Sequence, residues 1–256
     1  MILEYSFVQN ALLGSLLASI ACGLVGTYIV SRRLVLISGG ITHASFGGIG
    51  LGVYFGVNPI LAAMAFAVAS ACGVQWMSAR GRIREDSAIA VFWTFGMSLG
   101  IIFSFMTPGF VADLSSYLFG SILAIGPGDL WVLGIVAAAV VAAFDPVFAR
   151  SLRLPVPAIE YIMMALTAMT IVATLRLVGI VLAISLLTMP QLTAGIFTYS
   201  FPRMATLSIL FGMAYCAGGL AVSYWLNVPS GASIIFVSII IYAALKTIKT
   251  AAAKFM

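Results

Sequence analysis

The sequence predicts an all-α integral membrane protein, a polytopic bundle of about eight to nine transmembrane helices. Of its 256 residues, 63% are hydrophobic and only 7% are charged, whereas roughly 25% of the residues in an ordinary soluble domain are charged. Its 25 glycines suit helices that associate in lipid, because small residues let two backbones approach closely. We expect one transmembrane domain over residues 1–256.

Apolar windows of about 20 residues, the length that crosses the hydrocarbon core as a helix, recur along the chain. They cover residues 7–30, 60–79, 87–106, 128–148, 160–177, 179–199, 204–226 and 231–248, with a shorter glycine-rich window at 41–56. The first window is longer than the apolar core of a signal peptide and follows Glu4 without any basic residue, so we interpret it as a retained span.

Residues 107–127 form the one long stretch that proline and glycine interrupt too often for a confident span. We expect either short helices at the outer surface or a re-entrant half-helix, which is tolerated where protein surrounds it.

The basic residues predict the orientation of the helices. If the Arg32-Arg33 pair is cytoplasmic and segment 107–127 is external, 11 of the 12 basic residues face the cytoplasm and Arg176 alone lies outside. Cytoplasmic loops of membrane proteins carry an excess of Lys and Arg. We therefore expect an external N-terminus and a cytoplasmic C-terminus.

His43 is the one histidine of the chain and falls near the membrane midplane if the helix runs from Arg33. An ionisable group at that depth is a functional candidate because its burial carries a cost, and neutral imidazole binds zinc, manganese or iron. Helical spacing puts Gly39 and Gly47 on its face, which leaves room for an ion, water or a second helix. Alternatively, His43 bonds a nearby carbonyl and the glycines only serve packing, with Gly48 and Gly52 forming a close-contact ridge.

Two further segments hold polar residues with two open interpretations each. Around Pro190, the side chains of Ser185, Thr188 and Gln191 either line a polar path or bond back to their own helix. The second segment runs from Phe144 to Pro157. It suits a short cytoplasmic helix that a soluble partner could contact, with Asp145 as N-cap and Pro146 as first helical residue. Alternatively, it is a surface loop whose arginines only set the topology. Its basic residues are Arg150 and Arg153.

Several motifs are absent from the sequence. It contains neither a GxxxxGK[ST] phosphate-binding loop nor an HExxH zinc site, so we expect a transport subunit that is not itself an enzyme. Cys22, Cys72 and Cys216 lie in apolar stretches without a CxxC pair and are expected to be packing residues.

The motifs taken together resemble those of the membrane permease subunits of zinc, manganese and iron ABC importers. The matching segments run in order over nearly the whole chain: Leu34 to Ala44 with its Thr42-His43-Ala44, Leu118 to Gly120, Phe144 to Pro146 with Ala149, Val178 to Pro190, and Pro229 to Ala232.

This resemblance implies a multi-pass subunit of a bacterial or archaeal plasma (inner) membrane that imports a divalent transition metal, zinc first and manganese or iron next. It implies no permanently bound cofactor and ATP hydrolysis by a partner. The implied partners are a second copy of the chain, two cytoplasmic ATPase subunits and an extracellular or periplasmic metal-binding protein. Asp145 to Arg153 would be the helix that docks into the ATPase. His43 would be the metal ligand, beside a path through Gly39, Thr42 and Gly47.

The sequence departs from the family pattern at Gly39, where such permeases carry an aspartate one turn before the histidine, so only His43 carries over. A self-contained secondary transporter or channel is the main alternative, but the seven acidic residues all lie near span ends, away from the membrane interior where coupling ions bind. An intramembrane hydrolase pairing His43 with Ser45 or Ser233 is a third possibility without a supporting motif.

Overall fold

The computed structural model describes residues 6–81, 83–107, 126–143 and 156–252, and its regular elements within these ranges are all helices. In chain order they are α1 (Ser6–Ser31), α2 (Val35–Tyr54), α3 (Pro59–Gly81), α4 (Glu85–Met106), α6 (Pro127–Ala143), α8 (Val156–Leu186), α9 (Met189–Phe197), α10 (Phe201–Leu226) and α11 (Ser230–Ala252). The predicted all-α fold is confirmed.

Eight helical segments of the described part are long and apolar enough to cross a membrane. The apolar part of α6, Pro127–Val141, is shorter. Helix α8 joins two of the predicted spans, and Gly179 separates them with a non-helical backbone at φ 76° and ψ 172°. Only glycine takes this conformation readily, because it has no Cβ.

The glycine-rich window is longer than the sequence suggested. Helix α2 begins at Val35 and has 20 residues, whereas the apolar window began at residue 41. The polar residues before that point fit inside the helix, because the buried Ser38 hydroxyl donates to the carbonyl of Val35. The window therefore belongs to a helix that is long and apolar enough to cross a membrane.

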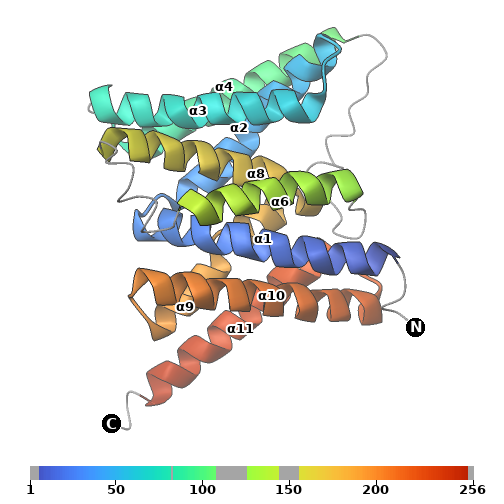
Figure 1. Ribbon diagram of the computed structural model, residues 1–256, viewed down its shortest axis with the longest axis vertical. Coiled ribbons are helices and arrows are strands. Elements are labelled where there is room, and N and C mark those ends of the chain that lie inside the picture. The colour runs from blue at the N-terminus through green and yellow to red at the C-terminus, as the bar shows by residue number, and fades with distance from the viewer. Residues whose placement is uncertain (1–5, 82, 108–125, 144–155, 253–256) are drawn as a thin grey trace.

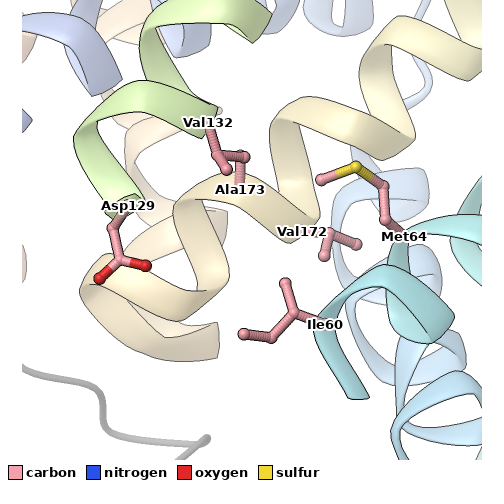
Figure 2. A pocket seen from close by; sticks show the side chains of 6 residues that line it. All are labelled: Ile60, Met64, Asp129, Val132, Val172 and Ala173. Atoms are coloured by element: carbon pink, nitrogen blue, oxygen red, sulfur yellow. The ribbon is translucent and has the colours of Figure 1, made fainter. Parts of the chain in front are cut away.

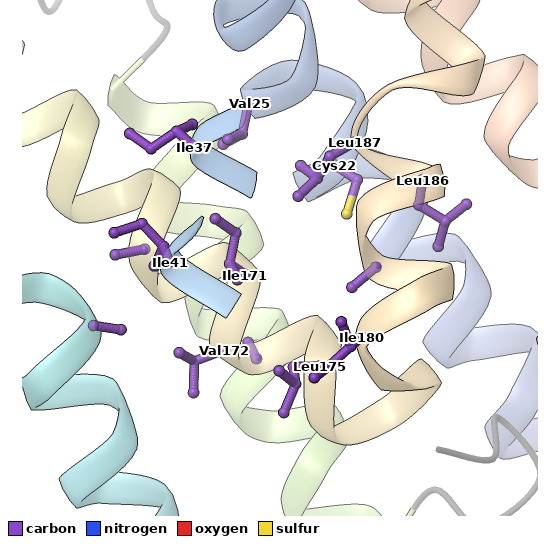
Figure 3. Packing of buried hydrophobic residues seen from close by; sticks show 14 of the residues in the cluster. Cys22, Val25, Ile37, Ile41, Ile171, Val172, Leu175, Ile180, Leu186 and Leu187 are labelled. Carbon is purple, nitrogen blue, oxygen red and sulfur yellow. The ribbon is translucent and has the colours of Figure 1, made fainter. Parts of the chain in front are cut away.

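The helices lie side by side in three groups along the long axis of the molecule (Figure 1). Helix α2 packs against α3 and α4 at one end, α1 packs against α6 and α8 in the middle, and α10 packs against α9 and α11 at the other end. Buried aliphatic residues of α1, α2 and α8 join the groups into one core (Figure 3). Cys22 and Cys216 are buried free thiols, as expected of packing residues.

Close backbone contacts hold α2 between its two neighbours. A Cβ on Gly48 would lie 2.5 Å from the carbonyl oxygen of Ala62 in α3, and a Cβ on Gly96 of α4 would lie 2.5 Å from the Cα of Ala44. Contacts this short leave no space for a methyl group. The predicted glycine ridge of α2 is thus a packing surface, matched by glycines of α4.

Helix α1 begins and α11 ends on opposite sides of the bundle in Figure 1. Which side is external stays a prediction. Most of segment 107–127 and the predicted docking helix, with Asp145, Pro146, Arg150 and Arg153, lie outside the described residues.

Candidate functional site

His43 lies near the middle of α2. It is the ninth of the 20 residues of this helix, about 12 Å from its start at 1.5 Å per residue. Its side chain is partly exposed, whereas Thr42 and Ala44 on either side are buried. The imidazole therefore lies at an open face of the bundle at mid-depth.

The His43 imidazole stacks on an aromatic ring and lacks a hydrogen bond at one nitrogen. Its ring centroid lies 4.6 Å from that of Trp93 in α4, with an angle of 6° between the planes, and 6.4 Å from that of Phe46. Its Nδ1 atom is buried without a hydrogen-bond partner. The structure therefore contains no hydrogen bond from Nδ1 to a neighbouring carbonyl, which was the alternative interpretation of His43 from the sequence.

Gly39, one turn before His43, is also partly exposed. A Cβ built there would lie 3.8 Å from Ile184 and 3.8 Å from Trp93, which are ordinary van der Waals distances. The fold thus has room for a Cβ at the position where the family resemblance led us to expect an aspartate. The absence of a carboxylate here is a property of the sequence and is not imposed by packing.

Thr42 and Gly47, the other two predicted path residues of α2, are buried. The Thr42 hydroxyl donates to the carbonyl of Ser38 in its own helix. A Cβ on Gly47 would lie 2.9 Å from the carbonyl oxygen of Gly96. In this conformation both residues serve helix packing, and the open face belongs to Gly39 and His43.

The polar residues around Pro190 hold the junction between α8 and α9. Thr188 has non-helical angles of φ −130° and ψ −49°, and its hydroxyl donates to the carbonyl of Ile184 at 2.9 Å. Gln191 is fully buried, and its amide donates to the carbonyl of Cys22 in α1 at 2.8 Å. Ser185 is buried as well. The sequence correctly located a loosened helix, but the side chains of Thr188 and Gln191 bond to backbone carbonyls.

The described residues contain no group of three or more His, Cys, Asp or Glu side chains that could hold a metal ion. The hydrolase alternative gains no support, because Ser45 donates to the carbonyl of Thr42 at 2.6 Å and Ser233 to that of Pro229 at 3.1 Å. The Ser45 hydroxyl is held within its own helix, and the Ser233 hydroxyl is held by the residue that precedes α11.

A small pocket of about 20 Å³ lies between α3, α6 and α8 (Figure 2), and His43 is not among its lining residues. Apart from Asp129, its lining is apolar: Ile60, Met64, Val132, Val172 and Ala173. The Asp129 carboxylate accepts a hydrogen bond from the backbone N–H of Gly126 at 3.1 Å, which caps the start of α6. This carboxylate therefore has a structural role.

Trp93 is the site residue that the sequence analysis missed. It lies 50 positions from His43, in a span whose aromatic residues look equivalent by pattern, so no local signal distinguishes it from a lipid-facing side chain. Only the packing of α4 against α2 brings the two rings together.

The chain matches the ABC 3 transport family over residues 4–248. It is 40% identical to an uncharacterized membrane protein of Synechocystis, with 94% of this chain and 90% of that protein covered. It is 34% identical to the manganese transport system membrane protein MntC of Halalkalibacterium halodurans, covering 94% and 87%.

The solved structure of PsaBC from Streptococcus pneumoniae in complex with Fab has the same fold, with a TM-score of 0.78 and 28% sequence identity. The alignment covers 95% of this chain and 92% of that one. The order of helices and the sequence match thus agree over nearly the full length, and the chain belongs to the ABC 3 transport family of membrane permeases.

Proposed function

We propose that this permease imports a divalent transition metal, which passes His43 on its way through the membrane. The observation that carries the proposal is the imidazole itself, which is partly exposed at mid-depth with its Nδ1 atom unpartnered. A polar ring in that environment is costly unless a ligand, water or another subunit completes its contacts. Neutral imidazole nitrogen is a common ligand of divalent transition metals.

Manganese is the first candidate for the metal, ahead of zinc and iron. Two relatives at 34% and 33% identity are named as manganese transport proteins. The names of these relatives support our choice of manganese, whereas the sequence analysis placed zinc first.

The path forms between two copies of the chain in this proposal. The open face with Gly39 and His43 cannot lie against lipid without leaving a polar ring in hydrocarbon. A two-fold partner would cover it and would bring a second His43 to the same path. The proposed arrangement has the N-terminus outside and the C-terminus in the cytoplasm of a bacterial or archaeal plasma membrane.

Energy comes from separate subunits in this proposal. Two cytoplasmic ATPases dock on the segment from Asp145 to Arg153, and an external binding protein delivers the metal. The path opens to each side in turn as the ATPases bind and hydrolyse ATP, so that the populations of the two conformations follow the nucleotide state.

The test is uptake into proteoliposomes that contain the permease and its ATPase, with the binding protein outside. We expect uptake of manganese that requires ATP. Zinc and iron should compete with manganese for uptake only weakly. Metal uptake that proceeds without ATP, or that an ion gradient drives in the absence of the ATPase, would refute the proposal and favour a secondary transporter.

A further inference from the structure

Three polar side chains from three elements meet at the end of the bundle where α1 ends and α8 begins. Arg32, in the turn between α1 and α2, pairs with Glu160 of α8 at 2.5 Å between Nη2 and Oε1. The other carboxylate oxygen of Glu160 accepts a hydrogen bond from the side-chain amide of Gln75 in α3 at 2.8 Å. Each oxygen of one carboxylate is thus held by a different element.

The exposure of these side chains decreases from the aqueous edge inward. The side chain of Arg32 is 48% exposed and that of Glu160 is 27% exposed, whereas Gln75 is buried at 6%. The hydrogen bond to Glu160 raises the pKa of the Arg32 guanidinium above its already high ordinary value, so this side chain stays charged. The guanidinium also lies 6.0 Å from the centre of the Tyr28 ring.

The other ion pair of the described residues differs in kind. Arg84 and Asp86 are 3.5 Å apart, with side-chain exposures of 85% and 52%. Arg84 and Asp86 are two residues apart in the sequence, so their contact does not connect two different helices. An exposed pair of this sort contributes little to stability, which makes it a suitable internal control.

The Arg32–Glu160–Gln75 cluster lies between the two regions that matter for the proposed function. Glu160 is the fifth residue of α8, which directly follows the segment expected to dock on the ATPase. Arg32 lies three residues before α2, and His43 follows about two turns into that helix. The chain therefore has a short physical connection from the docking segment to the candidate metal ligand.

The chemistry of the contact suits a connection that changes between states. Apolar side chains of similar size often stabilise a permanent contact as well as a charged pair does. A charged pair at the aqueous edge can separate at small cost, because both partners regain water. Gln75 gives Glu160 a second partner that stays in place on α3.

We propose that Glu160 is a positioning residue that transmits movement of the docking segment to α2 through Arg32. This inference rests on the proposed function. In the conformation described here the contact is closed. ATP binding by the partner subunits shifts the start of α8, opens the Arg32–Glu160 contact, and so moves α2 and His43 relative to α3.

The first test measures ATP hydrolysis and manganese uptake together in the assembled transporter, giving the number of ATP molecules used per metal. In Arg32→Glu, two like charges face each other, and we expect uptake to fall at least fivefold while ATP hydrolysis stays within about twofold. Adding Glu160→Arg should restore at least half of the uptake. The control Arg84→Gln should change neither quantity.

Equal losses of uptake and hydrolysis, without recovery in the charge-exchanged double variant, would overturn the inference in favour of a purely structural role. Unchanged uptake in Arg32→Glu would overturn it as well.

The second test needs no metal. Arg32→Cys and Glu160→Cys are introduced into a chain whose three own cysteines are replaced by alanine, and the pair is crosslinked in the assembled transporter. We expect the yield to fall at least threefold on addition of a non-hydrolysable ATP analogue. An unchanged yield overturns this inference even where metal transport is established. Failure of the unaltered transporter to take up metal overturns the proposed function. In that case the crosslinking result alone decides whether the Arg32–Glu160 contact responds to ATP.

Discussion

The imidazole of His43 and the indole of Trp93 lie parallel, with centroids 4.6 Å apart and an angle of 6° between the planes. The same indole lies 3.8 Å from the position that a Cβ on Gly39 would take. One side chain of α4 therefore covers both the candidate metal ligand and the empty space beside it. In this conformation, access to His43 on that side depends on Trp93.

We expect Trp93→Ala to raise the manganese concentration for half-maximal uptake by about two- to tenfold, because an aromatic pair contributes about 0.5–1.5 kcal/mol and fixes the ring orientation. Trp93→Phe keeps an aromatic face and should stay within about twofold of the unaltered protein. Uptake kinetics in proteoliposomes measure both. If the alanine and phenylalanine variants behave alike, the stacking has no part in transport.

We expect Gly39→Asp to fold normally and to bind metal more tightly. Its Cβ meets only ordinary contacts, and a carboxylate one turn before His43 adds an oxygen ligand of the kind manganese prefers. The matched control is Gly40→Asp, whose Cβ would lie 2.2 Å from Cγ2 of Ile89.

Thermal unfolding and half-saturating metal concentration distinguish these two variants. Gly39→Asp should keep its melting temperature and lower the half-saturating concentration, whereas Gly40→Asp should lose stability through overpacking. Loss of stability in both would mean that the space beside His43 is not available to a side chain.

Gln191→Ala should destabilise the protein by about 1–3 kcal/mol, because this fully buried side chain and its hydrogen bond from α9 to the Cys22 carbonyl of α1 are lost. Thr206→Ala is the control, since this exposed hydroxyl bonds only to carbonyls of its own helix. Denaturation in detergent measures both. A stable Gln191→Ala protein that fails to transport would instead support the original prediction that Gln191 lines the path.

The sequence alone predicted the helical spans well, because a membrane requires long apolar windows and each one appears directly in the composition. It also located the irregular region near Pro190 and the close-packing glycines Gly48 and Gly52. The start of α2 was predicted six residues late, since Ser38, Gly39 and Gly40 interrupt the apolar window although they fit within a packed helix.

The contents of the site could be predicted only in part. His43 is distinctive as the one histidine of the chain, and its depth follows from helix geometry. Gln191 and Thr42 looked like path residues by polarity, but their partners are carbonyls that only the folded structure identifies. Trp93 and the Arg32–Glu160 pair depend on contacts between distant segments, which a single sequence does not encode locally.

The most direct test of the account is ATP-driven manganese uptake by His43→Ala in proteoliposomes with the ATPase and binding protein present. Ser45→Ala, two residues away and bonded only within its own helix, is the control. We predict that His43→Ala loses at least nine-tenths of the uptake while assembling normally with its ATPase, and that Ser45→Ala keeps it. Full uptake by His43→Ala would contradict the assignment of this imidazole to the metal path.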